Sequence, residues 1–170
     1  MSIVPTSFLS LFLITALSLS GCTKAGKGNS VENPPDLERN INALRGAYAA
    51  FNRGDIDAAV QFLDPQIEWS EPVEFPGGGT YHGRDGAKQY LTQSRAAWAE
   101  VVSEPVQFIP ADNRIVVFVH ARVRPRDGSQ WQEVDLADVY TFREGKAIAM
   151  RAFADRHEAV RWAGVENSNR

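Results

Sequence analysis

The sequence predicts an α+β domain in which three N-terminal helices pack on a curved, mainly antiparallel sheet. Apolar residues recur at helical spacing early in the chain, whereas apolar and polar residues alternate through most of its second half. Clusters of Pro, Asn, Asp and Gly separate the alternating segments, as turns do. Because the helices come first and the strands follow, we expect the helices to close one face of the sheet.

Helical periodicity predicts each of the three helices. One apolar stripe of the first helix contains Leu37, Ile41, Leu44, Tyr48 and Phe51. Asp36 can cap the start of this helix and Gly54 can end it. Asp55 can cap a second, short helix that stops before Pro65, and a third helix is predicted from about Asp85 to Trp98.

Alternating patterns predict five strands. These strands span Ile67–Glu71, Val106–Ile109, Arg114–Arg124, Trp131–Phe142 and Ala147–Ala154. The turn Arg126-Asp127-Gly128 fits a three-residue hairpin loop, which would pair residues whose numbers sum to 254. A two-residue loop would shift that pairing by one residue and turn every side chain of one strand to the opposite face.

Composition excludes several functional classes. The chain has 170 residues, 44% of them hydrophobic, which suits one core and one domain. A net charge of −3 argues against binding nucleic acid, which needs an excess of Lys and Arg. One cysteine excludes an internal disulfide and a multi-cysteine zinc site, and three histidines without His-x-x-x-His spacing argue against a metal centre. The chain has no phosphate-binding loop, so we expect no cofactor and no metal.

The N-terminus has the pattern of a secretion signal. Every Lys, Arg, Asp and Glu lies after Cys22, and Phe8–Leu19 form an apolar run that is short for a membrane span but typical of a signal-peptide core. Leu19-Ser20-Gly21-Cys22 resembles the lipobox of bacterial lipoproteins, which implies that Cys22 becomes the lipidated first residue of the mature protein. By the lipoprotein sorting rule, Thr23 in place of Asp implies the outer membrane, facing the periplasm, in a Gram-negative cell. The alternative is an uncleaved N-terminal anchor with an incidental cysteine.

These patterns divide the chain into four segments. Residues 1–21 are predicted to be the lipoprotein signal peptide, and residues 22–35 the lipidated cysteine with a flexible Gly-, Ser- and Pro-containing tether. Residues 36–164 are predicted to form the folded domain, and residues 165–170 a disordered tail. The folded part is therefore expected in the bacterial cell envelope, outside the cytoplasm and attached to the membrane by its lipid.

Two short sequence segments and the order of the helices and strands resemble a known family. The segments are Tyr48-Ala-Ala-Phe51-Asn-Arg-Gly-Asp55 and Tyr81-His-Gly-Arg-Asp-Gly86. With the helices and strands around them, they resemble the SnoaL-like branch of the NTF2-like superfamily across roughly residues 37–160. That resemblance implies a cone-shaped fold with a pocket between sheet and helices, and as its ligand a small, mostly apolar molecule of polyketide or steroid type.

Two acidic residues are the candidate catalytic groups. Asp138 alternates with Leu136 and Tyr140 on an apolar strand face, where a carboxylate is costly unless it is paired or protonated. Glu71 precedes Pro72, sixteen residues after Asp55. Gly54-Asp55, Glu71-Pro72 and Asp138-Val-Tyr-Thr-Phe142 look similar to the ketosteroid isomerases.

That second resemblance implies specific roles. Glu71 would be the proton-shuttling base, and Asp138 would be a protonated hydrogen-bond donor to an oxyanion. The catalytic Tyr of those enzymes falls on Ala47, and Tyr48 lies one residue later, about 100° around the helix. The structural alternative is that Glu71 pairs with an Arg and Asp138 is a hydrogen-bonded acid without a catalytic role.

The remaining candidates are expected to bind the ligand. Their side chains are apolar or polar groups that the predicted faces direct at the pocket, namely Tyr48, Trp69, Phe118, His120, Arg122, Tyr140 and Met150. His120 and Arg122 reach the pocket only if the three-residue loop holds; a two-residue loop would turn both to the other face.

The sequence supports three functional classes. The first is a lipid-anchored module that binds a small apolar molecule. The second is an isomerase- or cyclase-like enzyme that uses Glu71 and Asp138 for proton transfer. The third is a protein-interaction module that uses the outer face of the sheet, for example as a homodimer.

Overall fold

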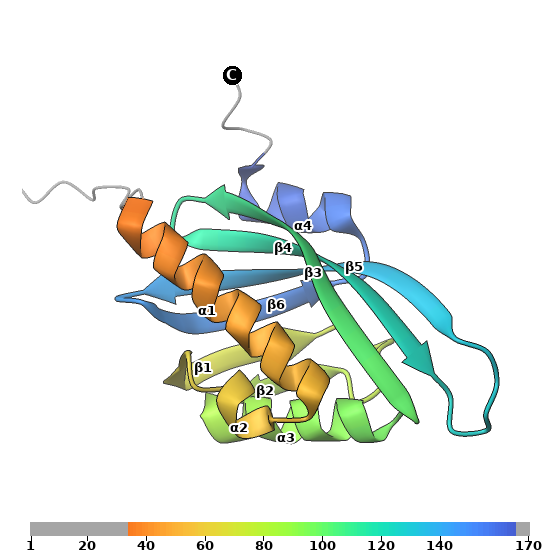
Figure 1. The fold of residues 1–170 in the computed structure, drawn as a ribbon. Helices are drawn as coiled ribbons and strands as arrows, with labels where there is room; N and C mark the ends of the chain where they lie inside the picture. The colour runs from red at the N-terminus through yellow and green to blue at the C-terminus, as the bar shows by residue number, and fades with distance from the viewer. Residues whose placement is uncertain (1–33, 166–170) are drawn as a thin grey trace, which may run out of the picture.

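The computed structural model describes residues 34–165. The predicted signal peptide, Cys22 and most of the predicted tether therefore lie outside the described residues, as does the predicted tail beyond Val165. The described residues form one sheet with helices on both of its faces (Figure 1).

Residues 34–165 form four helices, one more than the sequence predicted. They are α1 (Pro34–Arg53), α2 (Ile56–Ala59), α3 (Gly83–Ala96) and α4 (Arg156–Ala163). The three predicted helices are confirmed, although α2 has only four residues. The fourth was missed, yet its start and end carry ordinary signals: Asp155 accepts hydrogen bonds from the first free backbone amides, and Gly164 ends the helix with a φ of 82°. No helix among residues 34–165 is long and apolar enough to cross a membrane.

The sheet has six strands in the order β2-β1-β6-β5-β4-β3. The strands are β1 (Leu63–Glu71), β2 (Gly79–His82), β3 (Glu100–Ala111), β4 (Arg114–Arg124), β5 (Gln132–Arg143) and β6 (Lys146–Phe153). Neighbouring strands are antiparallel except β1 and β6, which are parallel. The α+β class is confirmed, and the short strand β2 is an addition to the prediction.

The sheet buries apolar side chains on both faces. On the inner face, Leu44, Ile67, Val117 and Tyr140 belong to the main core beneath α1, α2 and α3. On the outer face, a second core brings Val116, Ala137, Val139 and Phe153 against Ala159 and Ala163 of α4. The three N-terminal helices close the inner face, as expected, and α4, which the sequence did not predict, covers part of the outer face (Figure 1).

The pairing of β4 with β5 differs from the expected register by one residue. Val117 lies opposite Asp138 and His120 lies opposite Asp135, so paired residue numbers sum to 255 rather than 254. The turn at Gly128 does form, with its amide donating to the carbonyl of Pro125, but strand pairing resumes only at Val123 and Gln132. The intervening residues 125–131 form a loop long enough to absorb the shift.

The side chain of Asn52 attaches helix α1 to the edge of the sheet. The amide nitrogen of Asn52 donates to the carbonyl of Ser103 over 2.9 Å, and the backbone amide of Ser103 donates to the side-chain oxygen of Asn52 over 2.8 Å. Because β3 is an edge strand, these two backbone groups have no strand partner on that side. The Asn52 pair therefore fixes the C-terminal half of α1 against β3.

We predict that Asn52→Ala lowers the free energy of unfolding by about 2 kcal/mol, because it leaves two backbone groups of Ser103 without their partner. Chemical denaturation followed by circular dichroism measures the change. Gln66→Ala serves as the control, since Gln66 is an exposed strand residue. Equal stability of the two variants would contradict the assigned role of Asn52.

Candidate functional site

A cavity of about 310 Å³ lies between the inner face of the sheet and helices α1, α2 and α3. Its walls are mainly apolar and aromatic, and side chains from seven elements and from the loop after β1 contribute to them. The aromatic side chains that line it are Tyr48, Phe51, Phe62, Trp69, Phe75, Tyr90, Trp98 and Tyr140. This size and lining are typical of a site for a small organic molecule.

Two carboxyl groups point into this apolar cavity. Asp138 comes from the middle of β5 and Glu71 from the end of β1, and both are half-buried residues that line the cavity. The hydroxyl of Tyr48 donates to Oδ2 of Asp138 over 2.5 Å, and Nε1 of Trp69 donates to Oε1 of Glu71 over 2.8 Å. Each acid is therefore held by an aromatic side chain that also forms part of the wall.

Burial is the largest cause of the raised pKa of both acids. Burial raises the pKa of Asp138 to about 6, although the hydrogen bond from Tyr48 opposes that rise. Burial and the charge of Asp138 raise the pKa of Glu71 to about 8, against the hydrogen bonds from Trp69 and Tyr90. Near neutral pH the two acids together therefore retain a proton and carry about one negative charge.

No basic side chain of residues 34–165 compensates that charge. Among the described residues, no Lys, Arg or His lines the cavity, and none forms an ion pair with Glu71 or Asp138. The causes that shift the pKa of each acid likewise include no cation. The Arg partner that the structural alternative gives to Glu71 is thus missing from the described part of the chain.

Four of the seven predicted ligand-binding residues lie in or beside the cavity. Tyr48, Trp69 and Tyr140 line it and are buried. Met150 is buried in the same core, where β6 places it opposite Tyr140, but it belongs to the packing behind the wall rather than to the wall itself.

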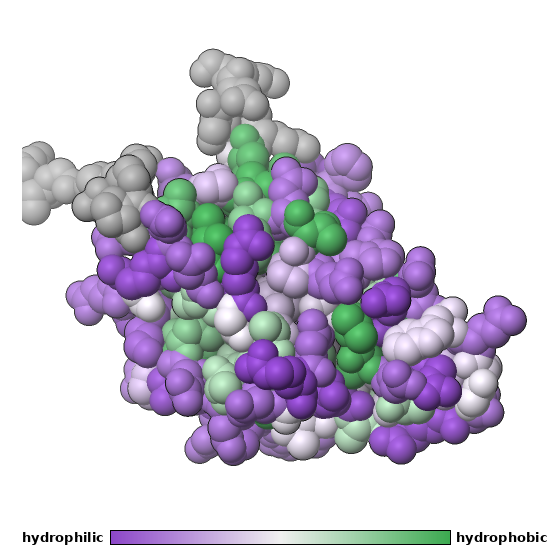
Figure 2. All heavy atoms as spheres, viewed as in Figure 1, coloured by the Kyte–Doolittle hydropathy of each residue, from purple (hydrophilic) through white to green (hydrophobic). Residues whose placement is uncertain are grey.

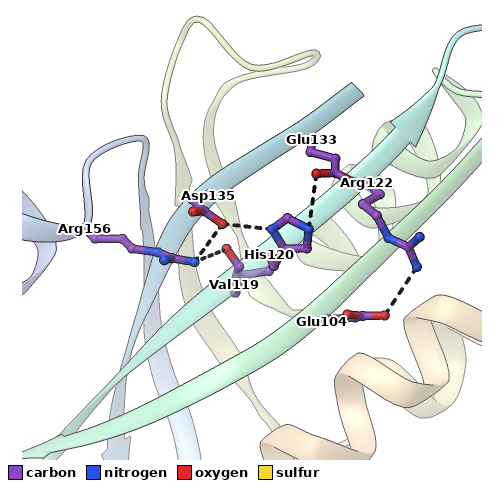
Figure 3. A network of polar contacts seen from close by, with 7 residues as sticks. All are labelled: Glu104, Val119, His120, Arg122, Glu133, Asp135 and Arg156. Atoms are coloured by element: carbon purple, nitrogen blue, oxygen red, sulfur yellow. Dashed lines mark hydrogen bonds and ion pairs between the residues drawn. The ribbon is translucent and has the colours of Figure 1, made fainter. Parts of the chain in front are cut away.

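The other three, Phe118, His120 and Arg122, point to the outer face, so their predicted place in the pocket is wrong. Figure 3 shows His120 between Asp135 and Glu133, with its Nδ1 2.9 Å from Oδ1 of Asp135. Arg122 pairs with Glu104 over 3.4 Å. The cause is the one-residue shift in the pairing of β4 and β5, since odd-numbered residues of β4 share the face of Asp138.

Arg156 extends this outer network. It bonds to Asp135 over 3.0 Å and to the carbonyl of Val119 over 2.9 Å, and its guanidinium lies 5.1 Å from the centre of the Phe118 ring (Figure 3). The hydrogen bond with His120 and the positive charge of Arg156 lower the pKa of Asp135. The network thus joins the start of α4 to the outer face of the sheet.

The prediction also missed residues that line the cavity. Tyr90 lies on α3 and lines the cavity together with Leu91 and Ser94, so helical periodicity could have located it in the wall. Phe75 and Pro76 lie in the loop after β1, a segment that the sequence marked only as a break between elements. Loop residues follow no periodicity, so nothing in the pattern directed them to the cavity.

We predict that Tyr48→Phe raises the pKa of Asp138 further, because the variant loses the hydrogen bond that stabilises the carboxylate. Titration of the Asp138 carboxyl carbon by NMR measures the shift. Tyr81→Phe is the matched control, since it also loses one hydroxyl hydrogen bond, to the carbonyl of Gly77. A pKa of Asp138 that is equal in both variants would show that Tyr48 does not stabilise the carboxylate.

Two solved structures with a similar fold are more than a quarter identical in sequence to this chain. TerC co-crystallised with polyporic acid is 29% identical over 72% of this chain and 98% of TerC, with a TM-score of 0.63. An NTF2-like protein of unknown function from Burkholderia pseudomallei K96243 is 28% identical over 72% of this chain and 95% of its own, also with a TM-score of 0.63.

A putative SnoaL-like polyketide cyclase from Jannaschia sp. CCS1 shares the fold alone, at 16% identity over 78% of this chain and 95% of its own, with a TM-score of 0.60. No sequence among curated proteins matches the chain. The model of the SnoaL-like domain, in contrast, matches residues 44–150, which include both cavity acids and most of the cavity wall. This chain therefore belongs to the family of SnoaL-like domains.

Proposed function

We propose that this domain binds a small, mostly apolar molecule in the cavity between its sheet and helices α1 to α3. The observation that carries the proposal is an apolar, aromatic cavity that contains two carboxyl groups and is not filled by side chains. The complex of TerC with polyporic acid adds support, because a similar fold with 29% identity was crystallised with a small molecule.

The cavity also favours small-molecule binding over the interaction module. The outer face, which that module would use, is partly covered by α4. On the side of α1 and β3, which Figure 2 shows, hydrophobic side chains likewise form separate groups among hydrophilic ones. The cavity, in contrast, is lined mainly by apolar and aromatic side chains.

A second candidate function is proton transfer in an isomerase- or cyclase-like reaction. The observation that favours it is the acid pair itself, since burial separates the pKa values of Glu71 and Asp138 and places them around neutral pH. In this proposal Asp138, which has the lower pKa, is the ionised base that accepts the proton near neutral pH, and Glu71 is the protonated acid that donates a hydrogen bond to a developing oxyanion. These roles are the reverse of those that the resemblance to the ketosteroid isomerases implies. Tyr48, which bonds to Asp138, would position that base.

Binding can be tested with two alanine positions of α1. Ala47 lines the cavity, whereas Ala49 is exposed on the same helix. We predict that mass spectrometry of the full-length protein, purified in detergent, detects a small molecule that co-purifies with the wild type and with Ala49→Phe but is lost from Ala47→Phe. Retention of the molecule in both variants would place it outside the cavity.

The location of the domain is a separate part of the proposal. We infer from the lipobox pattern that Cys22 carries a lipid and holds the domain at the cell envelope, outside the cytoplasm, facing the periplasm from the outer membrane in a Gram-negative cell. Cys22→Ser should abolish labelling by a fatty-acid probe and release the protein from the membrane fraction. Labelling that persists in this variant would refute the assignment of Cys22.

A further inference from the structure

The charge of the cavity restricts the chemistry of its ligand. About one negative charge lies on Glu71 and Asp138, and among residues 34–165 no Lys, Arg or His lines the cavity to balance it. A buried charge without a counter-ion is costly, and an anionic ligand would add to that cost. A ligand that carries one positive charge would instead lower this cost, because it would neutralise the carboxylate.

The aromatic walls next to the acids suit such a cation. The ring of Trp69 lies 6.3 Å from that of Tyr140 in an edge-on arrangement and 6.2 Å from that of Tyr90. Tyr48 completes this group through its bond to Asp138. Several aromatic rings around one point attract an ammonium group by their electron-rich faces, and the attraction is strongest where water is excluded.

A second pocket, at the surface, is lined mainly by acidic residues and therefore also favours a positively charged ligand. Glu71 also lines a polar groove of about 510 Å³ on the other side of β1. The acidic residues of this groove are Glu68, Glu71, Glu74, Asp155 and Glu158. Its one basic lining residue, Arg151, is stacked over the rings of Phe153 and Trp162. A field of this sign attracts cations toward the wall that contains Glu71.

We propose that the cavity selects a small organic cation, a protonated or quaternary amine with an apolar body, whose ammonium group lies among Tyr48, Trp69 and Tyr140 beside Asp138. This inference rests on the proposed small-molecule binding. A metal ion fits the site less well, because no group of three or more potential metal-binding side chains gathers anywhere in residues 34–165.

Three probes of one shape test the proposal. Benzyltrimethylammonium carries the positive charge, neopentylbenzene is its neutral carbon counterpart, and phenylmethanesulfonate carries a negative charge. The indole Nε1–H of Trp69 donates to Glu71 inside the cavity, so its NMR shift in the full-length protein reports binding. At pH 7.5 we expect the cation to bind about tenfold or more tightly than the neutral probe, and the anion to bind least.

A matched pair of variants on β5 identifies the counter-ion. Asp138→Asn should reduce the preference for the cation over the neutral probe to about onefold, while the neutral probe still binds. Asp135→Asn makes the same change on the outer face of the same strand and should keep the preference. A preference that survives Asp138→Asn would overturn the role of Asp138.

The pH dependence gives an independent readout. Titratable groups that face Asp138 within the cavity are Tyr48 from α1, Glu71 from β1, Tyr90 from α3 and Tyr140 from β5, and the lining residues of β3 and β4 carry none. Glu133 of β5 borders the cavity, but its carboxylate lies beside His120 on the outer face. Below the pKa of Asp138 of about 6, a proton replaces the charge that the cation needs. Affinity for the cation should therefore fall as the pH drops from 7.5 to 5, whereas affinity for the neutral probe should stay constant.

The outcomes separate this inference from the function on which it rests. If the neutral probe binds as tightly as the cation, or the anion binds best, the selection of a cation is wrong while small-molecule binding stands. If none of the three probes shifts the Trp69 signal, and no molecule co-purifies with the wild type, both the inference and the proposed function are wrong.

Discussion

The pairing of Val117 with Asp138 determines the chemistry of both faces of the sheet. Side chains alternate along each strand, so this one register places Val117, Val119, Ala121 and Val123 of β4 on the face of Asp138 and sends His120 and Arg122 to the outer face. The inner face thereby keeps its acids and loses its cations. A register one residue different would bring a histidine and an arginine into the cavity and neutralise the pair.

Stability and function make opposite demands on the two acids. Burial raises their pKa values in the folded state. The free energy of unfolding therefore falls as the pH rises from the usual pKa of a carboxyl group to the raised value. The domain offsets this cost with hydrogen bonds from Trp69 and Tyr48 rather than with salt bridges. Hydrogen bonds stabilise a carboxylate without cancelling its charge, so the charge remains available to a ligand or to a proton.

Much of the fold followed from the sequence, and the errors have identifiable causes. Periodicity located the three N-terminal helices, and the alternation in β5 correctly placed Leu136, Asp138 and Tyr140 on the inner face. Helix α4 was overlooked although its capping residues are visible in the sequence. The orientation of His120 depended on the length of a loop, and local turn preferences do not fix where pairing resumes. Positions within one element were therefore predictable, whereas relations between elements were not.

Strand β3 is a long edge of the sheet, and its sequence opposes pairing with the edge of another chain. It pairs only with β4, and exposed edge strands of this length readily recruit the edge of another chain. Three features of β3 oppose such recruitment. Pro105 and Pro110 offer no amide proton, the register breaks between Pro105 and Gln107, and Asn52 already occupies the backbone groups of Ser103. The side chain that fastens α1 over the cavity thus also protects the protein from edge-to-edge aggregation.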